Sequence, residues 1–181
     1  NYFSQTFSVG SASHTLNTIR LKLLAEGATP GNLYVSVRAT DGSGLPSGTD
    51  LSTGTYSGAL LTTTAGGAWY EVTMSDYILS AGTKYAIVCY GTGTTSSLNI
   101  HWRYDISSGA AYSGGAMYNS TNGGVTWAAD VNGSDMMFEV YGTPVVSVDD
   151  ARVYSNYKED DDWIIVARYT CNDPLFAPYG D

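Results

Sequence analysis

Apolar and polar residues alternate with a period of two along most of the chain, and no segment has the periodicity of an amphipathic helix. In residues 19–26 the odd-numbered side chains are apolar, whereas charged side chains occupy most even-numbered positions. The same alternation recurs in residues 33–40, 98–104 and 136–141. Each pattern is typical of a β-strand with one buried face and one polar face.

Residues 84–90 differ, because apolar side chains occupy both faces of the predicted strand. Such a strand is expected at the centre of a sheet, covered on both sides. Turn signals rich in Gly and Asp separate these segments from shorter candidate strands at residues 3–9, 51–56, 69–74, 116–120 and 125–129. About ten short strands with this spacing predict an all-β fold, an antiparallel two-sheet sandwich.

One turn has a distinctive pattern, Ser-x-Asn-x-Gly-x-Thr-Trp, made by Ser120, Asn122, Gly124, Thr126 and Trp127. The serine and asparagine side chains can bond turn amides, the glycine can take a positive φ, and the tryptophan can fold back over the turn. The pattern resembles the Asp-box, a hairpin motif of sialidase-like propellers and other secreted carbohydrate-active proteins. That resemblance implies a structural role away from any chemistry. Because no repeat recurs at a propeller-like period, one copy does not predict a propeller.

Further short motifs extend from residue 7 to residue 142. They are Phe7-Ser-Val, Leu16-x-x-Ile19-x-Leu21-x-Leu23, residues 35–48, Trp69-x-x-Val72, residues 79–88 and Phe138-x-Val-Tyr-Gly142. Together they resemble the jelly-roll modules of secreted, surface-anchored and phage-derived proteins, known as choice-of-anchor or carbohydrate-binding-module-like domains. The resemblance implies a jelly-roll sandwich over residues 1–143. It implies no single activity, because sites vary on this scaffold.

The composition changes after this module, and residues 144–181 form an acidic C-terminal extension. Its acidic run at residues 158–162 reads as a solvated segment, and the next residues, 163–169, predict one strand that is apolar on both faces. Such a strand has to add to a sheet of its own domain, begin another domain, or pair with a neighbouring copy. Because the chain opens at Asn1 inside a predicted strand, we expect a processed or truncated piece.

Net charge excludes two classes of partner. The chain carries a formal charge of −9 and has no basic stripe, so it would repel nucleic-acid phosphates and anionic membranes. It also has no apolar run of membrane length, and we expect no membrane insertion. With 43% hydrophobic and 13% aromatic residues, the chain has enough core-forming material to exclude disorder.

Two cysteines, Cys89 and Cys171, leave two alternatives open. In an extracellular protein they can form one long-loop disulfide, whereas the favoured reading is two unpaired thiols with Cys89 in the core. Two cysteines and two histidines at unrelated spacings predict no zinc site.

The sequence offers little for catalysis, and we expect no enzymatic activity. Glu71 and Glu139 alternate with their neighbours on separate strands, which places them on an outer sheet face more readily than in a glycosidase pair. His14 and His101 have no nearby serine elbow or aspartate that would suggest a hydrolase triad.

The one cofactor for which the sequence offers candidate ligands is a structural calcium ion. Jelly rolls of the resembled type often hold calcium at a sheet edge, through carboxylates and backbone carbonyls. The candidate ligands at strand ends are Asp41, Asp50, Asp105 and Asp135. The favoured alternative is that these aspartates only stabilise the turns in which they lie, through hydrogen bonds to the backbone.

For ligand binding, aromatic rings flanked by hydrogen-bonding side chains are how β-sandwich modules hold sugars. The candidate residues are Tyr34, Arg38, Tyr90, His101, Arg103, Tyr112 and Tyr118. The alternative is cross-strand aromatic pairing that only stabilises the sheet. Asn119 and Asn132 match the N-glycosylation pattern in predicted turns, which matters only in a host that glycosylates.

These observations predict a non-catalytic jelly-roll module outside the cell, on a cell surface or a virus particle. There it would serve in surface decoration, adhesion or glycan recognition, with a glycan or copies of itself as partner. One alternative is a structural subunit of a virion or extracellular filament, assembled as a homo-oligomer through its C-terminal strand. Another is an accessory carbohydrate-binding module of a glycoside hydrolase.

Overall fold

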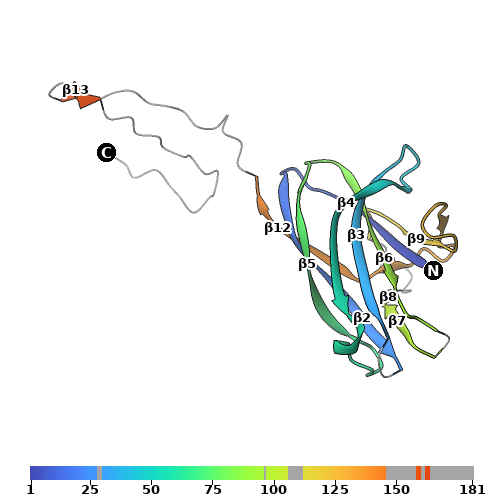
Figure 1. Cartoon of the computed structure of the whole chain (residues 1–181). Coiled ribbons are helices and arrows are strands. Elements are labelled where there is room, and N and C mark those ends of the chain that lie inside the picture. Colours follow the sequence, from blue (N-terminus) through green and yellow to red (C-terminus); the bar gives the residue numbers. More distant parts are fainter. Residues whose placement is uncertain (28–29, 96, 106–111, 146–157, 160–161, 164–181) are drawn as a thin grey trace. The chain divides into compact units, whose positions relative to one another are not determined.

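The computed structural model describes residues 1–27, 30–95, 97–105, 112–145, 158–159 and 162–163 (Figure 1). Its contacts divide the chain into two compact units, Asn1–Pro144 and Val145–Asp181. The first unit consists of antiparallel sheets packed together, and its described residues contain no α-helix, only a 3-10 turn at Gly58–Leu60. This confirms the predicted all-β class. The described residues include no helix with the length and apolar character needed to cross a lipid bilayer.

The larger sheet has six strands in the order β10-β9-β1-β6-β3-β4. Their bounds are β1 (Tyr2–Ser8), β3 (Asn32–Thr40), β4 (Pro46–Ser57), β6 (Lys84–Gly91), β9 (Met117–Ser120) and β10 (Ala128–Ala129). Strand β6 lies between β1 and β3, and Tyr85–Cys89 are all buried. The apolar residues on both of its faces had predicted this central, doubly covered position.

The smaller sheet has four strands, with β2 (His14–Glu26) at its centre. Strand β5 (Ala68–Leu79) pairs with one edge of β2. On the other edge, β12 (Phe138–Pro144) pairs with the first part of β2 and β7 (Asn99–Trp102) with the last part. The inward side chains of β2 form the middle of the core, and Leu16, Ile19, Leu21 and Leu23 are fully buried.

On one side of the sandwich, strands β4 and β5 bring the two sheets together. The Thr53 amide donates to the Ser75 hydroxyl at 2.9 Å, and the Ser52 hydroxyl donates to the Ser75 carbonyl. Gly54 makes this approach close: a Cβ added there would lie 2.5 Å from the Thr73 carbonyl oxygen. A side chain at residue 54 is therefore incompatible with the contact between the two strands.

On the other side, two predicted strands are interrupted. The alternation in residues 98–104 and 136–141 predicts one strand each, but the structure divides the first at Arg103 and the second at Met137. The Arg103 amide bonds the Lys22 carbonyl at 2.8 Å, and the Met137 amide bonds the Arg103 carbonyl at 2.9 Å. Beyond this crossing, β8 (Tyr104–Asp105) leaves β2 and pairs with β11 (Asp135–Met136).

The hairpin between β9 and β10 has the predicted side-chain bonds. Ser120 Oγ accepts from the Gly124 amide at 2.9 Å, and Asn122 Oδ1 accepts from the Thr126 amide at 3.0 Å. Gly124 has φ +81°, and Trp127 is half-buried. A Cβ added at Gly124 would lie 3.4 Å from both Trp127 and Tyr2, so the hairpin folds over its own tryptophan and contacts β1.

In the second unit, the structure describes only the pair β13 (Lys158–Glu159) and β14 (Asp162–Trp163). The acidic run was predicted to be solvated linker and residues 163–169 a single strand. Lys158 and Glu159, at the start of the acidic run, pair with Asp162 and Trp163 as two short antiparallel strands. The predicted strand beyond Trp163 lies outside the described residues, as does Cys171.

Candidate functional site

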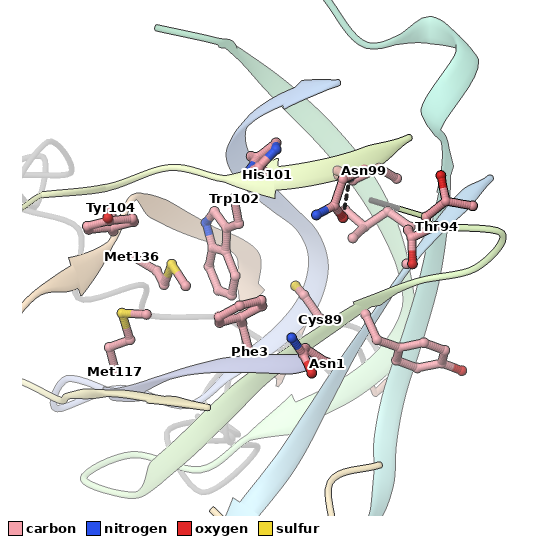
Figure 2. Close-up of a pocket in the computed structure, with 15 residues that line it drawn as sticks. Asn1, Phe3, Cys89, Thr94, Asn99, His101, Trp102, Tyr104, Met117 and Met136 are labelled. Atoms are coloured by element: carbon pink, nitrogen blue, oxygen red, sulfur yellow. Dashed lines mark hydrogen bonds between the residues drawn. The ribbon is translucent and has the colours of Figure 1, made fainter. Parts of the chain in front are cut away.

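A hollow of the first unit lies between the larger sheet and strands β7, β8 and β11, and we call it the inter-sheet cleft (Figure 2). Its volume of about 430 Å³ falls within the range of roughly 300–1,000 Å³ that is usual for small-molecule sites. The larger sheet contributes Phe3 from β1, Cys89 from β6 and Met117 from β9. The opposite wall of the cleft is formed by Trp102 from β7, Tyr104 from β8 and Met136 from β11.

One end of the cleft is apolar. Trp102, Met117 and Met136 are buried there, and Tyr104 pairs with Met136 across the β8–β11 ladder. The Trp102 indole N–H donates to the Met137 carbonyl at 2.9 Å. It is the one strong hydrogen-bond donor among the side chains of Trp102, Met117 and Met136, and it is therefore not available to a ligand. We call these three residues and Tyr104 the apolar end.

The opposite end is polar, as Figure 2 shows for Thr94 and Asn99, while Asn1 lies nearer to Phe3 and Cys89. Asn99 Oδ1 accepts from the Ile100 amide at 2.9 Å. The Asn99 amide nitrogen has no hydrogen-bond partner among the described residues, and therefore remains available to a ligand. Thr94, Thr95 and Asn99 form what we call the polar end.

Two aromatic rings of the cleft reach solvent. The Phe3 residue is 36% exposed and Tyr104 is 50% exposed, so a ligand can reach both rings. Phe3 faces inward from β1 beside Cys89, its partner on β6. Burial raises the pKa of the Cys89 thiol, so this neighbour of Phe3 is uncharged at neutral pH.

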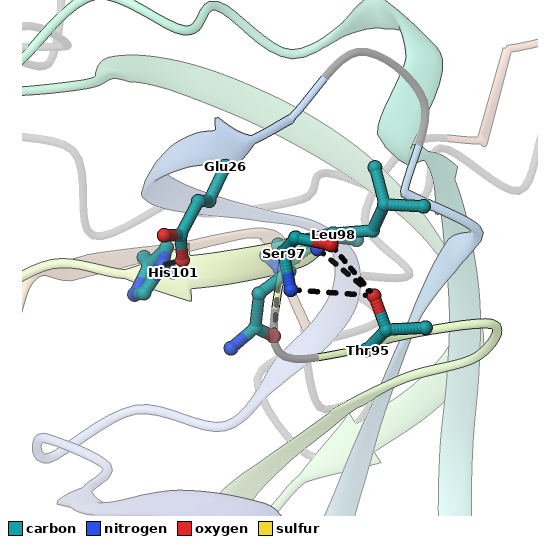
Figure 3. A network of polar contacts seen from close by, with 7 residues as sticks. Glu26, Thr95, Ser97, Leu98 and His101 are labelled. Carbon is teal, nitrogen blue, oxygen red and sulfur yellow. Dashed lines mark hydrogen bonds and ion pairs between the residues drawn. The ribbon is translucent and has the colours of Figure 1, made fainter.

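Local hydrogen bonds order the loop that carries the polar end (Figure 3). Thr95 Oγ1 accepts from the Leu98 amide at 3.1 Å, and the Thr95 amide donates to the Leu98 carbonyl at 2.7 Å. On the following strand, the His101 Nε2 atom lies 2.8 Å from a Glu26 carboxylate oxygen, within hydrogen-bond distance. These bonds hold Thr95 against Leu98 and His101 against Glu26.

The structure does not gather all seven predicted ligand residues at one site, although Tyr34, Arg38 and Tyr90 lie close together on the larger sheet. On the larger sheet Tyr90 stacks with two tyrosines: with Tyr34 at a centroid distance of 5.1 Å and an interplanar angle of 7°, and with Tyr2 at 4.3 Å and 18°. Both faces of the Tyr90 ring are thereby covered by other tyrosines. This is the cross-strand aromatic pairing that the sequence had left as the alternative.

The remaining predicted ligand residues have the following neighbours. Arg38 forms an ion pair with Asp50 at 2.7 Å, and the exposed Arg103 lines a shallow surface hollow with Glu26 and His101. The Tyr112 ring packs edge-on against Phe138 with centroids 5.3 Å apart, while Tyr118 lies half-buried in β9. Of the seven, only Tyr90 and His101 line the inter-sheet cleft.

The four aspartates proposed for calcium do not converge. Asp41 accepts from the Ser43 and Leu45 amides of its own turn, and Asp50 is held by Arg38. Asp105 and Asp135 are opposite each other in the β8–β11 pair, where Asp135 is buried and accepts from Gln5. Across the described part of the chain, no group of three acidic, histidine or cysteine side chains is placed to hold a metal ion.

Other predicted sites are placed as follows. Cys89 is a buried free thiol. Asn132 is exposed in a turn, whereas Asn119 lies within β9 and not in a turn, paired with Phe3 on one side and Ala128 on the other. Glu71 and Glu139 both flank Arg20 on the smaller sheet, at 3.6 and 2.6 Å.

The residues that form the cleft were largely missed from sequence. Phe3, Trp102 and Met136 read as ordinary inward positions of three strands, and nothing in the alternation shows that their strands border one hollow. The one local signal was Trp102 on the inward face of residues 98–104. No protein-family model matches the sequence, and the search of curated proteins finds no match either.

Proposed function

We propose that this chain is a non-catalytic, extracellular glycan-recognition module of the jelly-roll type that its motifs resemble, and that the glycan occupies the inter-sheet cleft. The observation that carries the proposal is the pair of solvent-reaching rings, Phe3 and Tyr104, in a cleft with one polar end.

The proposal follows from how sugars present themselves to proteins. A pyranose has apolar C–H faces that pack on aromatic rings, and hydroxyls around its edge that need hydrogen-bond partners. In the cleft, Phe3 offers ring surface, while Asn99 and Thr94 offer polar groups at one end. The tyrosine stack is a poorer platform, because Tyr90 has no free ring face.

The chemistry of the cleft supports binding without reaction. Its described lining contains no carboxylate, and its histidine, His101, is bound to Glu26. The carboxylates of Glu71 and Glu139, the candidates for glycoside hydrolysis, flank Arg20 on the smaller sheet and do not line the cleft. A glycan held in the cleft would therefore meet neither the acid nor the base that hydrolysis needs.

The experiment is a glycan-array screen of the full chain, followed by calorimetric titration of the strongest ligand. Phe3→Ala and Tyr104→Ala should each weaken binding by about tenfold or more, since each removes a stacking surface. The matched control is Tyr34→Ala, which removes an exposed ring outside the cleft and should leave the affinity unchanged. Loss of binding in Tyr34→Ala with retention in Phe3→Ala would move the site to the tyrosine stack. An array with no bound glycan would refute the proposal.

A further inference from the structure

We infer that the inter-sheet cleft selects hexopyranoses that carry a methyl group, as N-acetyl and 6-deoxy sugars do, and that this methyl enters the apolar end. The inference rests on the proposed function and adds the class of sugar. It follows from the unequal chemistry of the two ends of the cleft.

The buried side chains of the apolar end, Trp102, Met117 and Met136, offer no free strong hydrogen-bond partner for a hydroxyl. Met136 and Trp102 are 4% and 7% exposed, and the Trp102 N–H is already bonded to the Met137 carbonyl. A sugar hydroxyl placed there would lose its hydrogen bonds to water without gaining others, which is unfavourable. A methyl group has no such bonds to lose, and gains the apolar contact.

The side chains of this end also suit a small methyl group. Met117 and Met136 are flexible thioethers that adapt to irregular apolar surfaces. Cys89 in the middle of the cleft remains an uncharged thiol because of its burial. Nothing in this part of the described lining would therefore favour a charged or strongly hydrated substituent.

The polar end sets the orientation. Asn99 has a free amide nitrogen, and Thr94 presents a hydroxyl, so both can bond the hydroxyls or the acetamido carbonyl of a sugar. Figure 2 shows these groups opposite the methionines, with Phe3 and Trp102 between them. A sugar with its hydroxyls toward Asn99 thus directs one substituent toward the methionines.

The first experiment compares matched sugars on the full chain by calorimetry. The pairs are N-acetylglucosamine against glucose, and 6-deoxygalactose against galactose. The methyl-bearing member of at least one pair should bind about ten- to a hundredfold more tightly. This is the difference in affinity that one small apolar group typically produces in a pocket that fits it. The two pairs separate an acetamido methyl from a 6-deoxy methyl.

The outcomes distinguish the two proposals. Equal affinities within both pairs, with binding still lost in Phe3→Ala, would overturn the methyl inference while leaving glycan recognition intact. Binding of neither member of either pair would overturn the inference outright, and the glycan array would then decide the proposed function separately.

A second experiment places the methyl directly. The four methionines supply four methyl resonances when labelled with carbon-13. The preferred sugar should shift the signals of Met117 and Met136 and leave that of Met74, which is buried outside the cleft, unchanged. Met136→Gln should reduce the preference for the methyl-bearing sugar at least fivefold, while Met74→Leu retains it. If Met136→Gln does not fold, the methyl spectra of the unaltered chain still decide: shifts that spare both cleft methionines would refute the inference.

Discussion

Gln5 and Asp135 lie 130 residues apart and bond each other inside the sandwich, with Gln5 Nε2 donating to Asp135 Oδ1 at 2.8 Å. Gln5 is fully buried, and its Oε1 accepts from the Met136 amide, also at 2.8 Å. Asp135 Oδ2 in turn accepts from the Tyr112 amide. This buried polar group joins β1 to β11, two strands that border the inter-sheet cleft.

We predict that Gln5→Ala lowers the free energy of unfolding by about 2–4 kcal/mol. The substitution leaves the Met136 amide and one Asp135 oxygen buried without their partner, and each orphaned group costs about 1–3 kcal/mol. Urea denaturation measures the change. The control is Glu26→Gln, which removes the exposed carboxylate that His101 contacts and should change stability by less than about 1 kcal/mol. Equal effects of both variants would show that the buried bonds add nothing.

The hairpin motif makes a prediction at Asn122, where the resembled Asp-box has aspartate. Asn122→Asp retains the oxygen that accepts from the Thr126 amide and should preserve stability within about 0.5 kcal/mol. Asn122→Ala removes that acceptor and should cost about 1–2 kcal/mol, as the loss of a turn-capping side chain does. Thermal unfolding of both variants checks this ordering, and the reverse ordering would contradict it.

Trp127 is expected to be structural. Trp127→Ala should lower the free energy of unfolding by about 2–4 kcal/mol, somewhat less than for a fully buried ring, because Trp127 is half-buried. Glycan affinity, measured at a temperature where the variant is folded, should be unchanged, since Trp127 does not line the inter-sheet cleft. Unchanged stability together with lost binding would reverse this assignment.

Gly54 provides a test of how the sheets meet. Gly54→Ala should lower stability by several kcal/mol or prevent folding, because the new Cβ would lie 2.5 Å from the Thr73 carbonyl oxygen and 2.9 Å from Val72. Gly42→Ala is the matched control, since a Cβ there meets nothing within 4 Å. Equal melting temperatures for the two variants would show that β4 and β5 lie farther apart than in the structure.

Cys89 is predicted to be unreactive in the folded protein. Burial raises the pKa of its thiol, so at pH 8 the reactive thiolate is scarce. In Cys171→Ser, a disulfide reagent should label Cys89 only after urea is added. The mass of the unaltered chain without reductant tests the bridge: a mass two daltons lower than that of the dithiol would show that Cys89 and Cys171 are joined.

The strands could be predicted where burial follows local alternation, and could not where distant segments decide it. Residues 19–26 and 84–90 have patterns that match their positions in the sheets. In β1, by contrast, Ser4, Gln5 and Thr6 are all buried, because β6 and β9 flank the strand and Gln5 has partners from β11. A sequence pattern cannot show such partners.

The candidate site escaped prediction for the same reason. Exposed tyrosines were the natural choice for a sugar platform, yet Tyr34 and Tyr90 stack on one another once β3 and β6 pair in register. The cleft depends instead on the interruptions at Arg103 and Met137, which turn β8 and β11 away from β2. Backbone bonds between three distant segments produce those interruptions, and the alternation continues through them unchanged.

The pairing of β1 has a consequence for the synthesis of the chain. Its ladder partners among the described strands are β6 and β9, so Tyr2–Ser8 emerge from the ribosome well before Lys84–Gly91 exist to receive them. At elongation rates of about 5–20 residues per second, that delay lasts roughly 4–15 s. During this delay β1 is unpaired, and its polar residues Ser4, Gln5 and Thr6 make it less hydrophobic than β6. In the folded protein these three residues are buried. The wall of the cleft that Phe3 forms on β1 can therefore be completed only after β6 and β9 have been synthesised.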